Sequence, residues 1–189
     1  MRALTVLDSY AEANQSTAWN IRDGHPSAAD CSAAGQSFTA LANYFLYSAQ
    51  FWLKKNGTPV GGLTARLYAH SGTYGTSSVP TGAVLASSAE YNVAGLTVNY
   101  QLIEFVFPQP YYLLAGQTYC IDIEVSTEVT FNSSHYVIFG SDNTAPAHGG
   151  NCFRYNAGAW SANTQDACFY VNGILAGEGR LGKRKNTME

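Results

Sequence analysis

Apolar and polar side chains alternate along much of this chain, which is the pattern of half-buried β-strands. The clearest example runs from residue 63 to residue 70, where Leu63, Ala65, Leu67 and Ala69 alternate with Thr64, Arg66, Tyr68 and His70. The residues before it, 56–62, read NGTPVGG. Glycine reaches positive φ and proline fixes its own φ, so this segment predicts a turn that leads into the strand.

A second strand is predicted over residues 44–55, before that turn. Strict alternation places Phe45, Tyr47, Ala49, Phe51 and Leu53 on one face and Leu46, Ser48, Gln50, Trp52 and Lys54 on the other. Both sets contain large apolar groups, so we expect both faces to be partly covered. From Pro108 onward the chain is predicted to form a turn that feeds a strand ending at Val125, after an earlier strand at 100–107.

Further short strands are separated by turn residues, and no helical periodicity interrupts them. They are predicted at residues 3–10, 18–21, 35–40, 83–91, 136–140, 151–155, 159–161 and 167–173. This spacing predicts an all-β fold, an antiparallel β-sandwich of jelly-roll type, over residues 1–176. Residues 177–189 are then a short non-globular C-terminal tail.

Composition narrows the classes of partner. The 189 residues suit one domain, and only 12% of them are charged, about half of the usual ~25%. With 13 Tyr, 9 Phe and 3 Trp, the chain is expected to have wide uncharged surfaces that suit tight assembly or neutral ligands such as sugars. It has neither the broad basic face that nucleic acid requires nor the run of about 20 apolar residues that a membrane helix requires. We therefore expect no nucleic-acid and no membrane partner.

The candidate catalytic groups do not form a recognisable motif. The histidines, His25, His70, His135 and His148, have no GxSxG nucleophile nearby in sequence. Asp122 and Glu124 are two residues apart on one strand face, so a glycosidase pair is geometrically conceivable, but a solvated sheet face is the favoured interpretation. We expect no enzyme, no cofactor and no metal, since the cysteines lack a CxxC pair and Asp142–Asn143 reads as a plain turn.

Aromatic side chains near loops are the candidates for ligand binding. Tyr74 lies in a long loop predicted at 71–82, and Tyr155 and Trp160 flank the last hairpin. Exposed aromatic rings beside amides are the usual means of binding sugars. The alternative for each of them is a place in the core or in a contact between subunits.

Cys152 and Cys168 flank a predicted hairpin and could lie opposite each other, which makes a disulfide between them possible. Free buried thiols are the alternative, because cysteine is among the most buried residue types.

Several motifs follow one another in one order: QSFTA at 36–40, FWLKKNGTPVGGLTARLYA at 51–69, VPTGAVLASS at 79–88 and DACFYVNG at 166–173. This order resembles the jelly-roll domains labelled choice-of-anchor R, which recur in phage structural proteins and bacterial surface proteins. The resemblance covers about residues 5–173 and implies a module that displays, decorates or adheres. The family has no defining catalytic residues.

Two functions follow as expectations. Residues 1–15 do not read as a signal peptide, which favours a non-enzymatic virion structural protein, a head decoration, tail or fibre component made in the host cytoplasm and located in the virion. Its partners would be other virion subunits and copies of itself, with Arg180, Lys183, Arg184 and Lys185 docking the tail on a neighbouring subunit. The alternative is a carbohydrate-binding adhesion module of a virion or cell surface, whose ligand is a host surface glycan.

Overall fold

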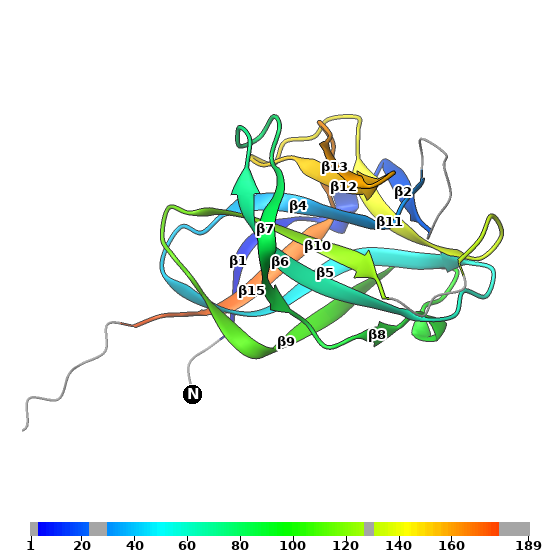
Figure 1. Cartoon of the computed structure of the whole chain (residues 1–189), viewed down its shortest axis with the longest axis horizontal. Coiled ribbons are helices and arrows are strands. Elements are labelled where there is room, and N and C mark those ends of the chain that lie inside the picture. Colours follow the sequence, from blue (N-terminus) through cyan, green and yellow to red (C-terminus); the bar gives the residue numbers. More distant parts are fainter. Residues whose placement is uncertain (1–3, 23–29, 127–130, 178–189) are drawn as a thin grey trace, which may run out of the picture.

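Two β-sheets pack face to face in the computed structural model of the chain (Figure 1). The structure describes residues 4–22, 30–126 and 131–177. In these ranges sheet A contains β1 (Thr5–Tyr10), β2 (Thr17–Ile21), β3 (Asp30–Cys31), β5 (Tyr44–Asn56), β9 (Gln101–Leu113), β11 (Tyr136–Asp142), β14 (Asp166–Ala167) and β15 (Phe169–Leu175). Sheet B contains β4 (Ala33–Thr39), β6 (Gly62–Ser71), β7 (Val79–Ser87), β8 (Tyr91–Asn92), β10 (Thr118–Val125), β12 (Cys152–Asn156) and β13 (Ala159–Ala162). Two short 3₁₀-helices, η1 (Glu12–Asn14) and η2 (Val93–Gly95), complete the elements that are described.

The predicted all-β sandwich is confirmed, and all strand pairs except β2 with β3 are antiparallel. The jelly-roll type of the sandwich stays a prediction. In sheet A the long strand β5 pairs with β9 along one side, and with β15 and β11 along the other. Sheet B has the order β13-β12-β4-β10-β6-β7. This order matters for function, because it decides which outward side chains become neighbours.

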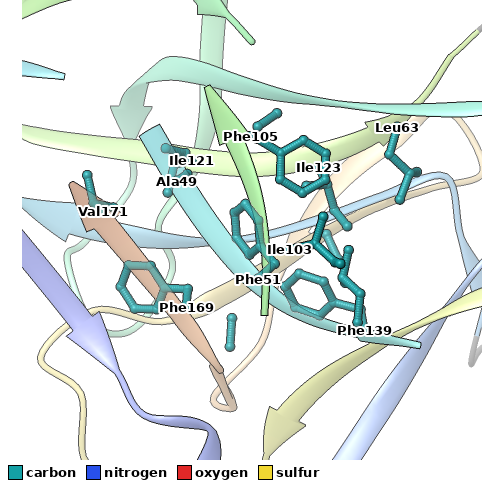
Figure 2. Close-up of a cluster of buried hydrophobic side chains, with 14 of the residues drawn as sticks. Ala49, Phe51, Leu63, Ile103, Phe105, Ile121, Ile123, Phe139, Phe169 and Val171 are labelled. Atoms are coloured by element: carbon teal, nitrogen blue, oxygen red, sulfur yellow. The ribbon is translucent and has the colours of Figure 1, made fainter. Parts of the chain in front are cut away.

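The core lies between the two sheets. Figure 2 shows Phe51, Phe105, Phe139 and Phe169 from sheet A facing Leu63, Ile121 and Ile123 from sheet B. The ring of Phe51 lies 6.1 Å from that of Phe105 and 5.5 Å from that of Phe139, measured between centroids. Burial of each such side chain contributes about 1.5–3 kcal/mol. The apolar set Leu63, Ala65 and Leu67 of the predicted alternation therefore faces the core, while Ala69 is only partly buried.

The faces predicted for β5 are wrong for its first residues, 45–47, because a β-bulge interrupts the alternation after them. The pairing of β5 with both β15 and β9 shifts between Leu46 and Ser48. One extra residue reverses which side chains point inward. Leu46 is thus fully buried beside Ala49 and Phe51, whereas Phe45 and Tyr47 are each 40% exposed on the outer face.

The turn predicted from Pro108 is also wrong, since β9 continues through it to Leu113. Val106 pairs with Ser48 while Tyr111 pairs with Leu46, so the residues 107–110 bulge out of the ladder. Proline has no backbone N–H and is tolerated where no ladder hydrogen bond is needed. The proline pair therefore marks a bulge rather than the end of the strand.

The disulfide considered between Cys152 and Cys168 is not formed. All four cysteines of the chain are described, and each is a buried free thiol. Cys152 belongs to β12 of sheet B, whereas Cys168 follows β14 in sheet A, where its carbonyl accepts a hydrogen bond from the amide of Trp52. The two residues are therefore built into different layers of the sandwich.

Candidate functional site

A groove crosses the outer face of sheet B and encloses about 470 Å³. Tyr155 of β12 and Trp160 of β13 line one side, and residues 82–84 of β7 line the other. Tyr68 of β6 and Glu124 of β10 also line it. The edge strands β13 and β7 contact each other although four strands separate them in the sheet order. Sheet B is thus curved strongly enough for its edges to approach across this face.

The aromatic side of the groove is held by a tight hairpin. Asn156 pairs with Ala159, so Ala157 and Gly158 alone form the turn, with φ of 51° and 85°. Positive φ at both central residues is characteristic of a type I′ turn. The same register places Tyr155 directly opposite Trp160.

Trp160 is the centre of an aromatic cluster. Its ring meets those of Tyr155, Phe153 and Tyr68 edge to face, with centroids 5.0, 5.5 and 6.0 Å away. Phe153 is fully buried, and Tyr155 and Trp160 are half-buried. Such edge-to-face pairs contribute about 0.5–1.5 kcal/mol beyond burial. The cluster fixes the orientation of Trp160 and leaves part of its ring at the surface.

A carboxylate and a guanidinium lie next to these rings. The Oε2 atom of Glu124 accepts a hydrogen bond of 2.6 Å from Nη1 of Arg66, and its Oε1 accepts one of 2.5 Å from the hydroxyl of Tyr68. The side chains of Arg66 and Glu124 are 35% and 17% exposed. Burial, and then the bond to Glu124, raise the pKa of Tyr68, so its hydroxyl stays a donor. Each carboxylate oxygen has a further lone pair with which it can accept a hydrogen bond.

Asp122 lies on the same outward face of β10 as Glu124, directly opposite Arg66 of β6, and it contradicts the solvated sheet face that was favoured for it. Its side chain is fully buried, and neither carboxyl oxygen makes a hydrogen bond with the described part of the chain. Burial is the main cause that raises its pKa, and the nearby charge of Glu124 adds to it. Gly35 leaves the room for this side chain, because a Cβ atom there would lie 2.6 Å from the Cβ of Asp122. The carboxyl group of Asp122, next to the lining of the groove, is thus in a site that disfavours its charged form.

Tyr74 does not line the groove. It is half-buried in the loop between β6 and β7, beside Gly149 of the loop that precedes β12. Burial is the first cause that raises its pKa. Of the three predicted ligand-binding aromatics, the structure brings Tyr155 and Trp160 together and leaves Tyr74 elsewhere.

The nearby His148 is a structural residue. Its Nε2 atom lies 3.0 Å from Oδ1 of Asp8, and its Nδ1 accepts a hydrogen bond of 3.0 Å from the amide of Gly150. Its own amide donates to Asp166 at 2.8 Å. Both ring nitrogens are thus occupied, and the side chain is only 8% exposed. His148 lies in the loop between β11 and β12 and joins that loop to β1 and β14.

His70 provides a serine–histidine contact with no access for a substrate. Its Nε2 lies 3.0 Å from the Oγ of Ser78, but Ser78 is fully buried.

No cluster of three or more His, Cys, Asp or Glu that could bind a metal is found in residues 4–22, 30–126 and 131–177. Over the same ranges, no helix is long and apolar enough to cross a membrane.

Sequence reasoning missed Arg66, Tyr68 and Glu124 as parts of the site. The alternation placed them on the outward faces of their strands, but it carried no information that β6 and β10 are neighbours. The tail residues Arg180, Lys183, Arg184 and Lys185, predicted to dock on a partner, lie outside the described residues.

No known family model matches the chain, and no curated protein is significantly similar to it.

Proposed function

We propose that this protein is a non-catalytic recognition module that binds a neutral carbohydrate in the groove of sheet B. The observation that carries the proposal is that three aromatic residues, Trp160, Tyr155 and Tyr68, line one groove of about 470 Å³ together with a carboxylate, Glu124, which Tyr68 contacts. Binding sites for small ligands are commonly about 300–1,000 Å³, mostly apolar, with a few placed polar groups.

The chemistry of the groove suits a sugar ring. Aromatic rings pack against the C–H face of a pyranose, which is apolar, while its hydroxyl groups need donors and acceptors at the rim. Glu124 supplies acceptors and Arg66 supplies donors side by side, held 2.6 Å apart. Since the charges of Arg66 and Glu124 compensate each other, the groove favours an uncharged ligand.

The position of Asp122 supports binding rather than hydrolysis. A glycosidase needs two carboxyl groups that both reach the substrate, across a separation of about 5–10 Å. Glu124 lines the groove, whereas Asp122 does not, and both of its carboxyl oxygens are buried. One accessible carboxylate paired with arginine recognises hydroxyl groups without supplying the second catalytic group.

A place in a virion is the setting that the sequence resemblance favours for this module. A head decoration, tail or fibre subunit with such a groove would attach a particle to a host glycan, so the structural role and the binding role are compatible. This setting rests on the resemblance alone and is tested by mass spectrometry of particles purified from the source.

The binding proposal is tested with an array of neutral, acidic and amino oligosaccharides, followed by calorimetric titration of the best ligand. We expect binding to neutral sugars, and at least tenfold weaker binding by Trp160→Ala and Tyr155→Ala, as for buried aromatic anchors in general. Tyr74→Ala is the matched control, because Tyr74 is half-buried in a loop outside the groove. The proposal fails if no array member binds, or if Trp160→Ala binds as tightly as the original chain.

A further inference from the structure

An apolar patch lies on the outer face of sheet A, on the opposite side of the sandwich from the groove. We name it the sheet A patch, and it consists of Leu4, Val6, Phe45, Tyr47, Val106 and Tyr112. These residues are between 38% and 54% exposed. Single exposed apolar residues are normal on proteins, whereas a contiguous group of them marks a contact surface.

The strand register makes the patch contiguous. Val6, Asn172, Ser48 and Val106 lie in one row across β1, β15, β5 and β9, so their side chains share one face. Phe45 pairs with Tyr112 in the next row whose side chains point outward, and the centroids of these two rings are 5.2 Å apart. The polar residues within the first row are hydrogen-bonded to each other, Nδ2 of Asn172 to Oγ of Ser48 at 3.3 Å. The β5 bulge is what turns Phe45 and Tyr47 outward into this patch.

Little charge surrounds the patch, and the carboxylate beside it, Glu104, accepts a hydrogen bond of 2.6 Å from Oγ of Ser48 in the first row. The segments 39–53, 105–121 and 167–177, which supply most of β5, most of β9 and all of β15, contain no Asp, Glu, Lys or Arg. Enrichment in aromatic residues and depletion of charge characterise the centre of a protein interface. A second copy of the chain that docks through this patch meets these uncharged segments, with Glu104 at their edge hydrogen-bonded to Ser48.

The size of the patch suits a dimer. A whole aromatic side chain has an accessible area of about 150–250 Å². With 38–54% of each side chain exposed, the six residues of the patch together present an accessible area on the order of 500 Å². A stable interface buries about 800 Å² per partner, of which about 65% is apolar in homodimers. A two-fold contact also needs no second complementary surface, since the same patch faces itself.

We propose that the sheet A patch is the contact between two copies of this chain in a two-fold dimer. The inference goes beyond the proposed function and does not depend on it. Because the groove lies on the outer face of sheet B, such a dimer keeps both grooves exposed and directed away from the contact. Two linked grooves would bind a multivalent ligand more tightly than one.

Sedimentation equilibrium of the full chain over a wide concentration range tests the dimer. We expect reversible dimerisation, and at least tenfold weaker association for Tyr112→Glu, which places a charge within the patch, opposite Phe45. Val98→Glu is the matched control, because Val98 is 68% exposed outside the patch. Circular dichroism and the melting temperature of each variant at low concentration establish that the fold is retained.

Three results would overturn the proposal. The first is a chain that stays monomeric up to millimolar concentration. The second is a dimer that Tyr112→Glu leaves unchanged while the variant is folded. The third is equal weakening by Tyr112→Glu and Val98→Glu, which would show a general effect of added charge rather than a contact at the patch.

Discussion

Tyr155 lies directly opposite Trp160 in the β12–β13 hairpin, and the centroids of their rings are 5.0 Å apart. The two-residue turn Ala157–Gly158 sets this register. A turn longer by one residue would place the two rings on opposite faces of the sheet. The aromatic side of the groove therefore depends on the backbone conformation of the turn Ala157–Gly158, which does not itself line the groove.

Ala157→Gly should stabilise the protein. Among the described residues, Ala157 is the one non-glycine residue with positive φ, at 51°. This conformation costs an L-residue about 1–2 kcal/mol, of which the greater freedom of glycine in the unfolded chain offsets a part. We expect the free energy of unfolding in urea to rise by up to about 1 kcal/mol. Ala159→Gly, in the following strand, should instead lower it by roughly 0.5–1 kcal/mol; equal losses for both variants would contradict this explanation.

Asp122→Asn should change how stability depends on pH. Burial raises the pKa of Asp122 in the folded chain above its value of about 3.9 in the unfolded chain. The folded chain then keeps a proton that the unfolded chain releases, so this group lowers the free energy of unfolding as the pH rises above about 4. An amide cannot ionise, and we expect the variant to equal the original chain near pH 4 and to exceed it in stability at pH 8. Denaturation at both pH values measures this; a variant that is less stable at pH 8 would show that the carboxyl group is ionised and paired.

Asp142→Asn should show the opposite pH dependence. Hydrogen bonds, above all from Ser16 and also from Thr144 and Tyr10, lower the pKa of Asp142 to about 2. Its stabilising contribution is therefore complete above about pH 4 and is lost as the pH falls toward 2. We expect the variant to lose about 1–3 kcal/mol at pH 7, as for bonds to a charged group, and the loss to shrink at pH 2. A constant loss across this range would mean that the carboxylate charge has no role.

The four thiols should be unreactive in the folded chain. All of them are buried, and burial is the main cause that raises the pKa of Cys168 to about 12 and that of Cys120 and Cys152 as well. Since the thiolate is the reactive form, we expect Ellman's reagent at pH 8 to detect four thiols only after denaturation. An unchanged melting temperature with reducing agent should accompany this. Detection of two thiols in the denatured chain would instead show that a disulfide forms.

Much of the fold was predictable because strand signals are local. The alternation over residues 63–70 and the glycine-rich turn before it correspond to β6 and to Gly57 and Gly61, with φ of 64° and 124°. Each depends only on residues that are adjacent in the chain. The bulges in β5 and β9 were not predictable in this way, because an extra residue is accommodated by the partner strands.

The groove was predictable in part. Tyr155 and Trp160 belong to one hairpin, so their proximity follows from a short piece of sequence. Tyr68 and Glu124 are 56 residues apart, and the hydrogen bond between them exists only because β6 pairs with β10.

The sequence by itself determined the all-β class, the inward faces of most strands and the aromatic hairpin, because period-2 patterns and turn residues act over a few neighbours. Only the tertiary structure decided which outward faces meet, where the bulges reverse a face, and that Asp122 is buried. Strand order is chosen by how the whole chain buries its apolar side chains between two sheets, and this is a property of all strands together. The groove and the sheet A patch are both consequences of that order.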